Sequence, residues 1–113
     1  MTNGCLSLRG SARRHDRFEW DRANREKCRK HGVSVADIEA AFARPIAVFP
    51  DPSHSHLEER FEAVGRTDNG RHVLTVFTLR AREVRTLIRP ISARFMHAKE
   101  VEHYEEAAAR IGD

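Results

Sequence analysis

A tight-turn sequence, Asp68-Asn69-Gly70, lies between two segments of alternating or largely apolar residues. Because Asn and Gly adopt the positive φ angles that match strand twist, such a turn between such segments is a strong signal for a β-hairpin. The first segment begins at Arg60, and the return segment runs from His72 to Leu79. We therefore expect two adjacent antiparallel strands, of which the second is apolar enough to lie in the middle of a sheet.

Three further segments have the composition of strands. One runs from about Val84 to Ser92 and contains Pro90, which removes a ladder hydrogen bond and therefore requires an edge, a bulge or a strand end. Residues 46–49 (Ile-Ala-Val-Phe) form a short apolar run, and residues 18–20 (Phe-Glu-Trp) alternate. These segments extend the predicted hairpin into a mainly antiparallel sheet.

Two helices are predicted ahead of the hairpin. Asp21 is a suitable N-cap for a helix over residues 22–31, and Gly32 follows where a left-handed C-cap belongs. Ser34 and Asp37 have the spacing of a capping box for a second helix. The next proline, at position 45, ends that helix because its ring cannot continue the hydrogen-bonding pattern.

A last helix is expected from His97 to Arg110, because its apolar residues are spaced by three, four and three to form one stripe. These residues are Val101, Tyr104, Ala108 and Ile111. The predicted order is thus β-α-α-β-β-β-β-α, an α+β fold with helices on one face of the sheet. Residues 18–113 form one domain, and residues 1–17, rich in Gly, Ser and Arg, are expected to be a flexible extension.

Composition excludes several classes of protein. The two cysteines, Cys5 and Cys28, have no metal or redox spacing, and we expect free thiols in a reducing compartment. No apolar run approaches the roughly 18 residues that a membrane span needs. These features predict a cytoplasmic protein without a membrane partner.

Charge is unevenly distributed along the chain. Residues 34–63 hold six acids and two bases, whereas residues 71–99 hold seven bases and one acid. Six of these seven bases are arginines, which bind phosphate through two parallel hydrogen bonds. The C-terminal half therefore suits a polyanion such as RNA. The alternative is that these are ordinary surface arginines with acidic partners from residues 34–63.

Some histidines and carboxylates are candidates for proton transfer. His31 precedes Gly32 at a helix end, where it serves either as a general acid or base or as a C-cap. Glu58 and Glu59 form a weak acid–base pair, unless one of them holds an arginine of the facing strand. His54-Ser55-His56 lacks a third ligand at zinc spacing, so no metal is expected.

Several short motifs occur in a specific order from about Phe18 to Glu106. They are Phe18-Glu19-Trp20-Asp21, Lys30-His31-Gly32-Val33, His54-Ser55, Glu59-Arg60, Gly65-Arg66, Phe77-Thr78 with Arg80, Ile91-Ser92-Ala93-Arg94, and Lys99-Glu100 with Tyr104. Together they resemble the BrnT toxins, the ribonuclease halves of bacterial type II toxin–antitoxin pairs.

The resemblance implies a RelE-like fold and cleavage of mRNA without a metal or other cofactor. It also implies a BrnA-type antitoxin of the ribbon-helix-helix class, which binds operator DNA and so connects the toxin to DNA only indirectly. The catalytic candidates that it suggests are His31, Glu59, Arg80, Arg89 and Arg94. The supporting RNA-binding candidates are Lys30, Arg60, Thr78, Arg85, Lys99 and Tyr104.

One departure from the family pattern concerns the first predicted helix. The family typically carries a lysine there, where this chain has Asn24, and Arg25 or Lys27 would have to replace it. If that lysine is needed for cleavage, the chain is a weaker nuclease or a non-catalytic relative that binds RNA or an antitoxin. A general single-strand RNA binder is a third alternative, although few aromatic residues are available for base stacking.

Overall fold

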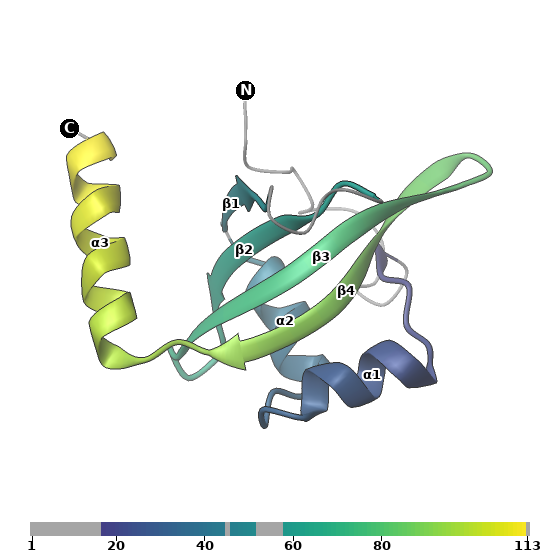
Figure 1. The fold of residues 1–113 in the computed structure, drawn as a ribbon, viewed down its shortest axis with the longest axis horizontal. Helices are drawn as coiled ribbons and strands as arrows, with labels where there is room; N and C mark the ends of the chain where they lie inside the picture. The colour runs from purple at the N-terminus through teal and green to yellow at the C-terminus, as the bar shows by residue number, and fades with distance from the viewer. Residues whose placement is uncertain (1–16, 45, 52–57, 113) are drawn as a thin grey trace.

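The computed structural model describes residues 17–44, 46–51 and 58–112, which form three helices and a four-stranded sheet (Figure 1). The helices are α1 (Arg22–Arg29), α2 (Val35–Phe42) and α3 (Ala98–Gly112), and the strands are β1 (Ala47–Pro50), β2 (Phe61–Arg66), β3 (His72–Arg82) and β4 (Arg85–Phe95). The strand order in the sheet is β1-β2-β3-β4, and every neighbouring pair is antiparallel. The predicted α+β class is therefore confirmed.

Capping groups start α1 and α2 where the sequence indicated. The Asp21 carboxylate accepts a hydrogen bond from the Asn24 backbone N–H at 2.9 Å, and the Asn24 side chain accepts one from the Asp21 N–H at 2.7 Å. The Ser34–Asp37 capping box forms in the same way. Gly32 has φ of +84°, a left-handed conformation that stops α1 without a steric penalty.

The hairpin between β2 and β3 forms as predicted. Gly70 has φ of +86°, and its N–H donates to the Thr67 carbonyl at 3.0 Å. This turn sets the register that pairs Arg66 with His72. In β4 the register shifts, because Val76 pairs with Ser92 and Phe77 with Pro90, so Ile91 forms a bulge. This bulge beside Pro90, on an edge strand, is the arrangement that the proline required.

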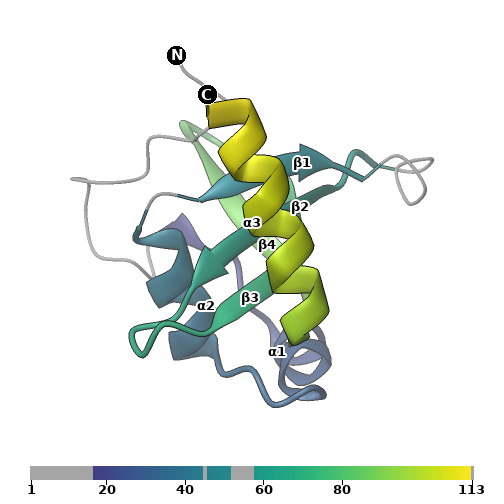
Figure 2. The ribbon, with the colours of Figure 1, turned by 90° about the vertical axis from the view of Figure 1, so that its left-hand side faces the viewer.

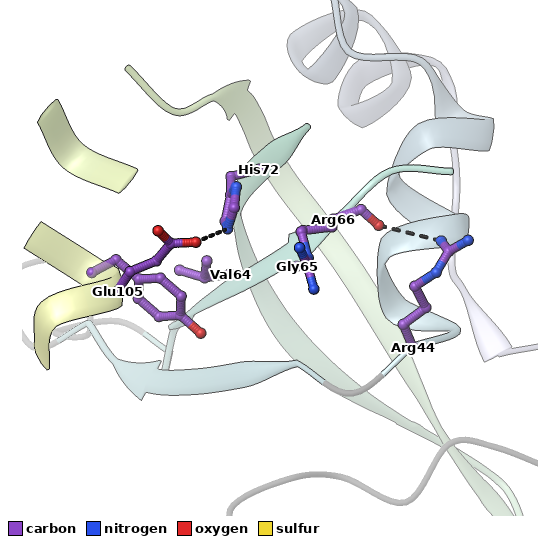
Figure 3. A pocket seen from close by; sticks show the side chains of 7 residues that line it. Arg44, Val64, Gly65, Arg66, His72 and Glu105 are labelled. Atoms are coloured by element: carbon purple, nitrogen blue, oxygen red, sulfur yellow. Dashed lines mark hydrogen bonds and ion pairs between the residues drawn. The ribbon is translucent and has the colours of Figure 1, made fainter. Parts of the chain in front are cut away.

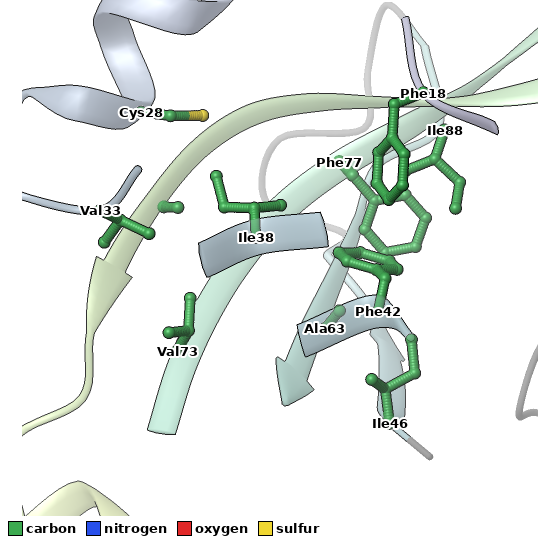
Figure 4. Packing of buried hydrophobic residues seen from close by; sticks show 11 residues of the cluster. Phe18, Cys28, Val33, Ile38, Phe42, Ile46, Ala63, Val73, Phe77 and Ile88 are labelled. Atoms are coloured by element: carbon green, nitrogen blue, oxygen red, sulfur yellow. The ribbon is translucent and has the colours of Figure 1, made fainter. Parts of the chain in front are cut away.

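The core lies between one face of the sheet and the two N-terminal helices (Figure 4). Phe42 of α2 makes edge-to-face contacts with Phe18 and Phe77, with ring centroids 5.6 and 5.4 Å apart. Val33, which precedes the N-cap Ser34, and Ile38, in the first turns of α2, are fully buried at the two positions of a hydrophobic staple. The core therefore fixes α1 and α2 to the sheet face that carries Val73 and Phe77.

The prediction of a first strand over residues 18–20 is wrong. Phe18 forms one isolated parallel bridge with Ile88, and the Glu19 N–H donates to the Ile88 carbonyl at 2.8 Å. The pairing cannot continue, because Asp21 already serves as the N-cap of α1. The segment nevertheless buries Phe18 beside the outer edge of β4.

The expectation that all helices share one face of the sheet is also wrong. Figures 1 and 2 show α3 standing at one end of the sheet, apart from the layer that α1 and α2 form. Val101 and Tyr104 of its predicted apolar stripe are only half-buried, and the side chains of residues 108–112 lie outside the description. Met96 and His97 separate α3 from β4, which allows the helix to turn away from the core.

Candidate functional site

The face of the sheet away from α1 and α2 carries the polar side chains, and we call it the open face. On β3, Val73 and Phe77 are buried in the core, so residues that alternate with them project to the opposite side. The antiparallel register extends this face to β2 and β4. Its described members on these three strands include Glu62, Val64, Arg66, His72, Leu74, Val76, Thr78, Arg80, Leu87, Arg89, Ser92 and Arg94.

A pocket of about 280 Å³ lies where the open face meets α3 (Figure 3). It is formed by the end of β2, the start of β3, the middle of α3 and Arg44, which follows α2. The residues that line it are Arg44, Val64, Gly65, Arg66, His72, Tyr104 and Glu105. The pocket thus brings together the residue types that transfer protons and bind phosphate.

His72 is central to the pocket. Its Nε2 atom lies 3.7 Å from Oε2 of Glu105, and its side chain is 13% exposed. The ring also contacts Tyr104 at an angle of 65°, with centroids 6.1 Å apart. The Glu105 carboxylate and the Tyr104 ring fix the orientation of the imidazole, a group that commonly transfers protons in catalysis, so His72 is placed as a proton-transfer group.

Two arginines flank this histidine. Arg44 is committed to the protein, since it donates to Asp68 at 2.9 Å and to the Arg66 carbonyl at 3.4 Å. Arg66 is exposed and is the cross-strand partner of His72. Its guanidinium forms no ion pair with any residue in the described part of the chain. Arg66 is therefore available to an anion that enters the pocket.

Arg94 holds the first turn of α3 rather than lining the pocket. Its two terminal nitrogens each donate to Glu100 at 2.8 Å, and the His97 N–H donates to the same carboxylate at 2.9 Å. The hydrogen bonds from Arg94 lower the pKa of Glu100 to about 2, and those bonds raise the pKa of Arg94. This bidentate pair sets the direction of α3 and so the position of Tyr104 and Glu105.

The remaining arginines of the open face are also paired with carboxylates. Arg80 lies 3.3 Å from Glu58, and Arg89 lies 2.9 Å from Asp21 and 3.6 Å from Glu19. The backbone hydrogen bond from Asn24, followed by the contact with Arg89, lowers the pKa of Asp21. The alternative of surface arginines with acidic partners from residues 34–63 is thus correct for Arg80 and wrong for Arg89, whose partners Glu19 and Asp21 lie outside that segment. The Arg80–Glu58 ion pair also confirms the alternative that one of the two adjacent glutamates holds an arginine of the facing strand.

The other predicted site residues are dispersed. Lys30 and His31 are exposed in the turn after α1, Glu59 is exposed, and Lys99 is exposed on α3. Thr78 is buried and donates to the Glu59 carbonyl at 2.7 Å, which fixes the chain ahead of β2. Arg60 is half-buried and Arg85 is exposed near the β3–β4 turn, and both make contacts within the protein. Of the predicted residues, only Tyr104 lines the pocket.

Sequence reasoning did not single out Arg66, His72 or Glu105 as site residues. A signal for the first two was present, because a hairpin closed at Asn69-Gly70 places Arg66 opposite His72. Glu105 lies beside Tyr104 on a helix whose direction depends on the Arg94–Glu100 pair. That direction is a tertiary property, which helical periodicity does not contain.

Asn24, which stands where the family pattern predicts a lysine, has a structural role. It is 4% exposed, and its side-chain amide donates to the carbonyls of Glu19 at 3.0 Å and Pro90 at 2.8 Å. These bonds join α1 to the edge of β4. Arg25 and Lys27, the suggested replacements, are exposed on α1 and do not line the pocket.

The described residues contain no group of three or more histidines, cysteines or acids that could hold a metal ion. His54 and His56, the histidines of the motif considered for a metal, lie outside the described residues. No described helix is both long and apolar enough to cross a membrane.

Comparison with known proteins identifies the family. Residues 20–100 match the family model described as the ribonuclease toxin, BrnT, of type II toxin–antitoxin systems. No curated protein matches the chain. The matched range contains α1, α2, the whole sheet and the Arg94–Glu100 pair that orients α3. The chain therefore belongs to the BrnT family of ribonuclease toxins.

Proposed function

We propose that this toxin cleaves mRNA without a metal ion, in the pocket between the open face and α3. The observation that carries the proposal is the placement of His72 against Glu105 and Tyr104, beside Arg66 on the adjacent strand, whose guanidinium has no acidic partner among the described residues. Family membership supplies the general activity, a ribonuclease toxin. The pocket supplies groups that fit that chemistry.

Cleavage of RNA without a metal requires movement of two protons and stabilisation of one anion. The neutral imidazole of His72 removes the proton of the 2′-hydroxyl, whose oxygen attacks the adjacent phosphorus. The Tyr104 hydroxyl gives a proton to the 5′-oxygen as its bond to phosphorus breaks. The products are a 2′,3′-cyclic phosphate and a 5′-hydroxyl end. Arg66 binds the phosphoryl oxygens and stabilises their charge in the transition state.

This assignment differs from the set that the resemblance suggested. His31 and Glu59 are exposed outside the pocket, so we assign proton transfer to His72 instead. Arg80, Arg89 and Arg94 are engaged with carboxylates, so we assign them the task of holding the sheet edge and α3. Tyr104 keeps a role at the site.

The partner that we propose is a BrnA-type antitoxin of the ribbon-helix-helix class, which also binds operator DNA. Membership of a type II toxin family implies an antitoxin. The open face and α3 are the surface that an antitoxin must cover to exclude RNA from the pocket. Co-expression with a BrnA-type protein followed by purification of a stable complex tests this assignment, and a failure to associate would refute it.

The proposed activity is tested with the purified chain, RNA and a chelator. His72→Gln keeps a polar side chain of similar size and removes proton transfer, so we expect a loss of roughly 10²–10⁴-fold in cleavage rate. His103→Gln is the matched control, since His103 is exposed on α3 and does not line the pocket. Thermal unfolding of each variant shows whether it is folded.

Two outcomes would overturn the proposal. Cleavage by His72→Gln at the parent rate would exclude this histidine, and loss of all cleavage in the chelator would exclude a metal-free reaction. Expression of the parent in bacteria gives a second readout, because growth should stop with the parent and continue with His72→Gln. RNA binding without cleavage or growth arrest would instead favour the non-catalytic alternative.

A further inference from the structure

The outer surface of α1 carries four exposed bases, which we call the α1 basic surface. They are Arg25, Lys27, Arg29 and Lys30. None of them forms an ion pair or a side-chain hydrogen bond within the described part of the chain. The only acid on this helix, Glu26, lies 3.4 Å from Arg22 and is thereby engaged.

Helix stability does not account for these charges. Bases in the last turn, Lys27 and Arg29, do compensate the helix dipole. Arg25 and Arg29 are four residues apart, however, so they lie side by side on the helix surface and repel each other. Lys27 and Lys30 are three residues apart and repel in the same way. The one acid of α1, Glu26, is paired with Arg22, so the three bases Arg25, Lys27 and Arg29 of the helix and Lys30 at its C-cap outnumber the acid that could offset them.

The α1 basic surface also differs from the arginines of the sheet. Arg80, Arg89 and Arg94 each have a carboxylate within 3.3 Å, so their charges are balanced inside the protein. The α1 bases keep their full charge for a partner. They also lie apart from the pocket: α1 covers the core face of the sheet (Figure 1), whereas none of the α1 bases is among the residues that line the pocket between the sheet and α3.

We propose that the α1 basic surface binds the phosphate backbone of RNA, as a second contact separate from the pocket. Asn24 and Cys28 of α1 are buried against the sheet, so they are not accessible to a binding partner. The exposed part of the helix has no aromatic or large apolar residue, which rules against membrane insertion and base stacking. Arginine and lysine without apolar neighbours suit a sequence-independent contact with phosphates.

This inference rests on the proposed function only for the identity of the polyanion. An RNA that occupies both sites must pass around the edge of the sheet from one face to the other. We expect a trinucleotide to occupy the pocket alone, whereas a long single strand can contact both sites. The α1 basic surface should therefore affect the binding of long RNA and leave the cleavage of a trinucleotide unchanged.

The test uses two variants of the full chain that lose the same amount of positive charge. The first removes the α1 bases: Arg25→Gln, Lys27→Gln, Arg29→Gln and Lys30→Gln. The control removes four bases elsewhere in the sequence: Arg9→Gln, Arg13→Gln, Arg14→Gln and Arg110→Gln. Fluorescence anisotropy gives the Kd for a long single-stranded RNA over a series of salt concentrations, and circular dichroism confirms that each variant is folded.

Each lost phosphate contact should lower the slope of log Kd against log salt by about 0.7, so four contacts lower it by roughly 3. Over a fourfold increase in salt, binding of the parent should then weaken roughly 50-fold more than binding of the α1 variant. The control variant should keep the parent's slope. Equal losses in both variants, or an unchanged α1 variant, would overturn the inference.

Cleavage of the trinucleotide separates this inference from the proposed function. If the parent cleaves it while the α1 variant binds long RNA as the parent does, only the inference fails. If the α1 variant loses binding while the parent cleaves no RNA, only the proposed function fails.

Discussion

A lysine at position 24 would destabilise this toxin and would not increase its activity. The resemblance to the family predicts a lysine where this chain has Asn24. Asn24→Lys is therefore the obvious substitution if that lysine is a catalytic group. In the structure Asn24 is buried between α1 and the edge of β4, and it does not line the pocket. The substitution therefore tests whether position 24 is structural or catalytic.

The size of the effect follows from the hydrogen bonds of Asn24. Its amide group donates to the carbonyls of Glu19 and Pro90, and its oxygen accepts from the Asp21 N–H. Each buried polar group that is left unpaired costs about 1–3 kcal/mol. Three such groups imply a loss of about 3 kcal/mol or more, before the cost of placing an ammonium group at a buried site. Since small domains unfold with about 5–15 kcal/mol, this loss is a large share of the total.

Urea denaturation followed by fluorescence measures the change. The chain has one tryptophan, Trp20, which lies four residues before Asn24 and donates to Glu39 at 2.9 Å. Its emission therefore reports on the segment that Asn24 holds. The matched control is Ala23→Lys, because Ala23 is exposed on the same helix, and a surface change of this kind stays within about 0.5 kcal/mol. A loss of 3 kcal/mol should also lower the Tm by roughly 12 °C or more.

A purely structural role for Asn24 would be refuted if Asn24→Lys unfolded within about 0.5 kcal/mol of the Ala23→Lys control. It would also be refuted if the lysine variant cleaved RNA faster than the parent. The first result would show that the three hydrogen bonds contribute little. The second would show that the residue at position 24 affects the rate of RNA cleavage.

The hydrogen bonds from Arg94 lower the pKa of Glu100 from 4.5 to about 2, so as the pH drops through that interval the unfolded chain is protonated first and the folded state loses stability. Glu100→Gln should therefore make the fall of Tm with pH less steep, and an unchanged pH profile of Tm would contradict this. A Cβ on Gly65 would lie 3.0 Å from the backbone oxygen of Ala41, so Gly65→Ala should lower the free energy of unfolding by about 1–3 kcal/mol in urea denaturation, unless α2 shifts without cost. Burial raises the pKa of the Cys28 thiol to about 11, so this thiol should react with a disulfide reagent at neutral pH only after unfolding. A Cys5→Ser variant leaves Cys28 as its single thiol, and rapid labelling of this variant in the native state would contradict the burial of Cys28.

Local signals in the sequence predicted most of the fold. The Asn69-Gly70 turn, the Ser34–Asp37 capping box and the bulge required by Pro90 each depend on a few neighbouring residues, and each forms as expected. Residues 18–20 show the limit of such signals. Their alternation is that of a strand, but the N-cap at Asp21 ends the pairing after one bridge.

The candidate site was harder to predict, because it depends on contacts between distant segments. The charge of an arginine is visible in the sequence, whereas its partner is not. Arg89 pairs with Asp21 across 68 positions of the chain, and Arg80 pairs with Glu58 across the sheet. Four of the seven bases in residues 71–99 are therefore paired with acids in space: Arg80, Arg82, Arg89 and Arg94.

These ion pairs change the surface to which RNA is expected to bind. Charges that are already balanced contribute little to counterion release, so the salt dependence of RNA binding must come from bases that have no acidic partner. In the described part of the chain such bases include Arg66 at the pocket and the α1 basic surface on the other side of the sheet. One guanidinium at the pocket suits the positioning of a single scissile phosphate, while four bases on α1 suit retention of a longer strand. Affinity for RNA and the cleavage step should therefore be separable by mutation in this toxin.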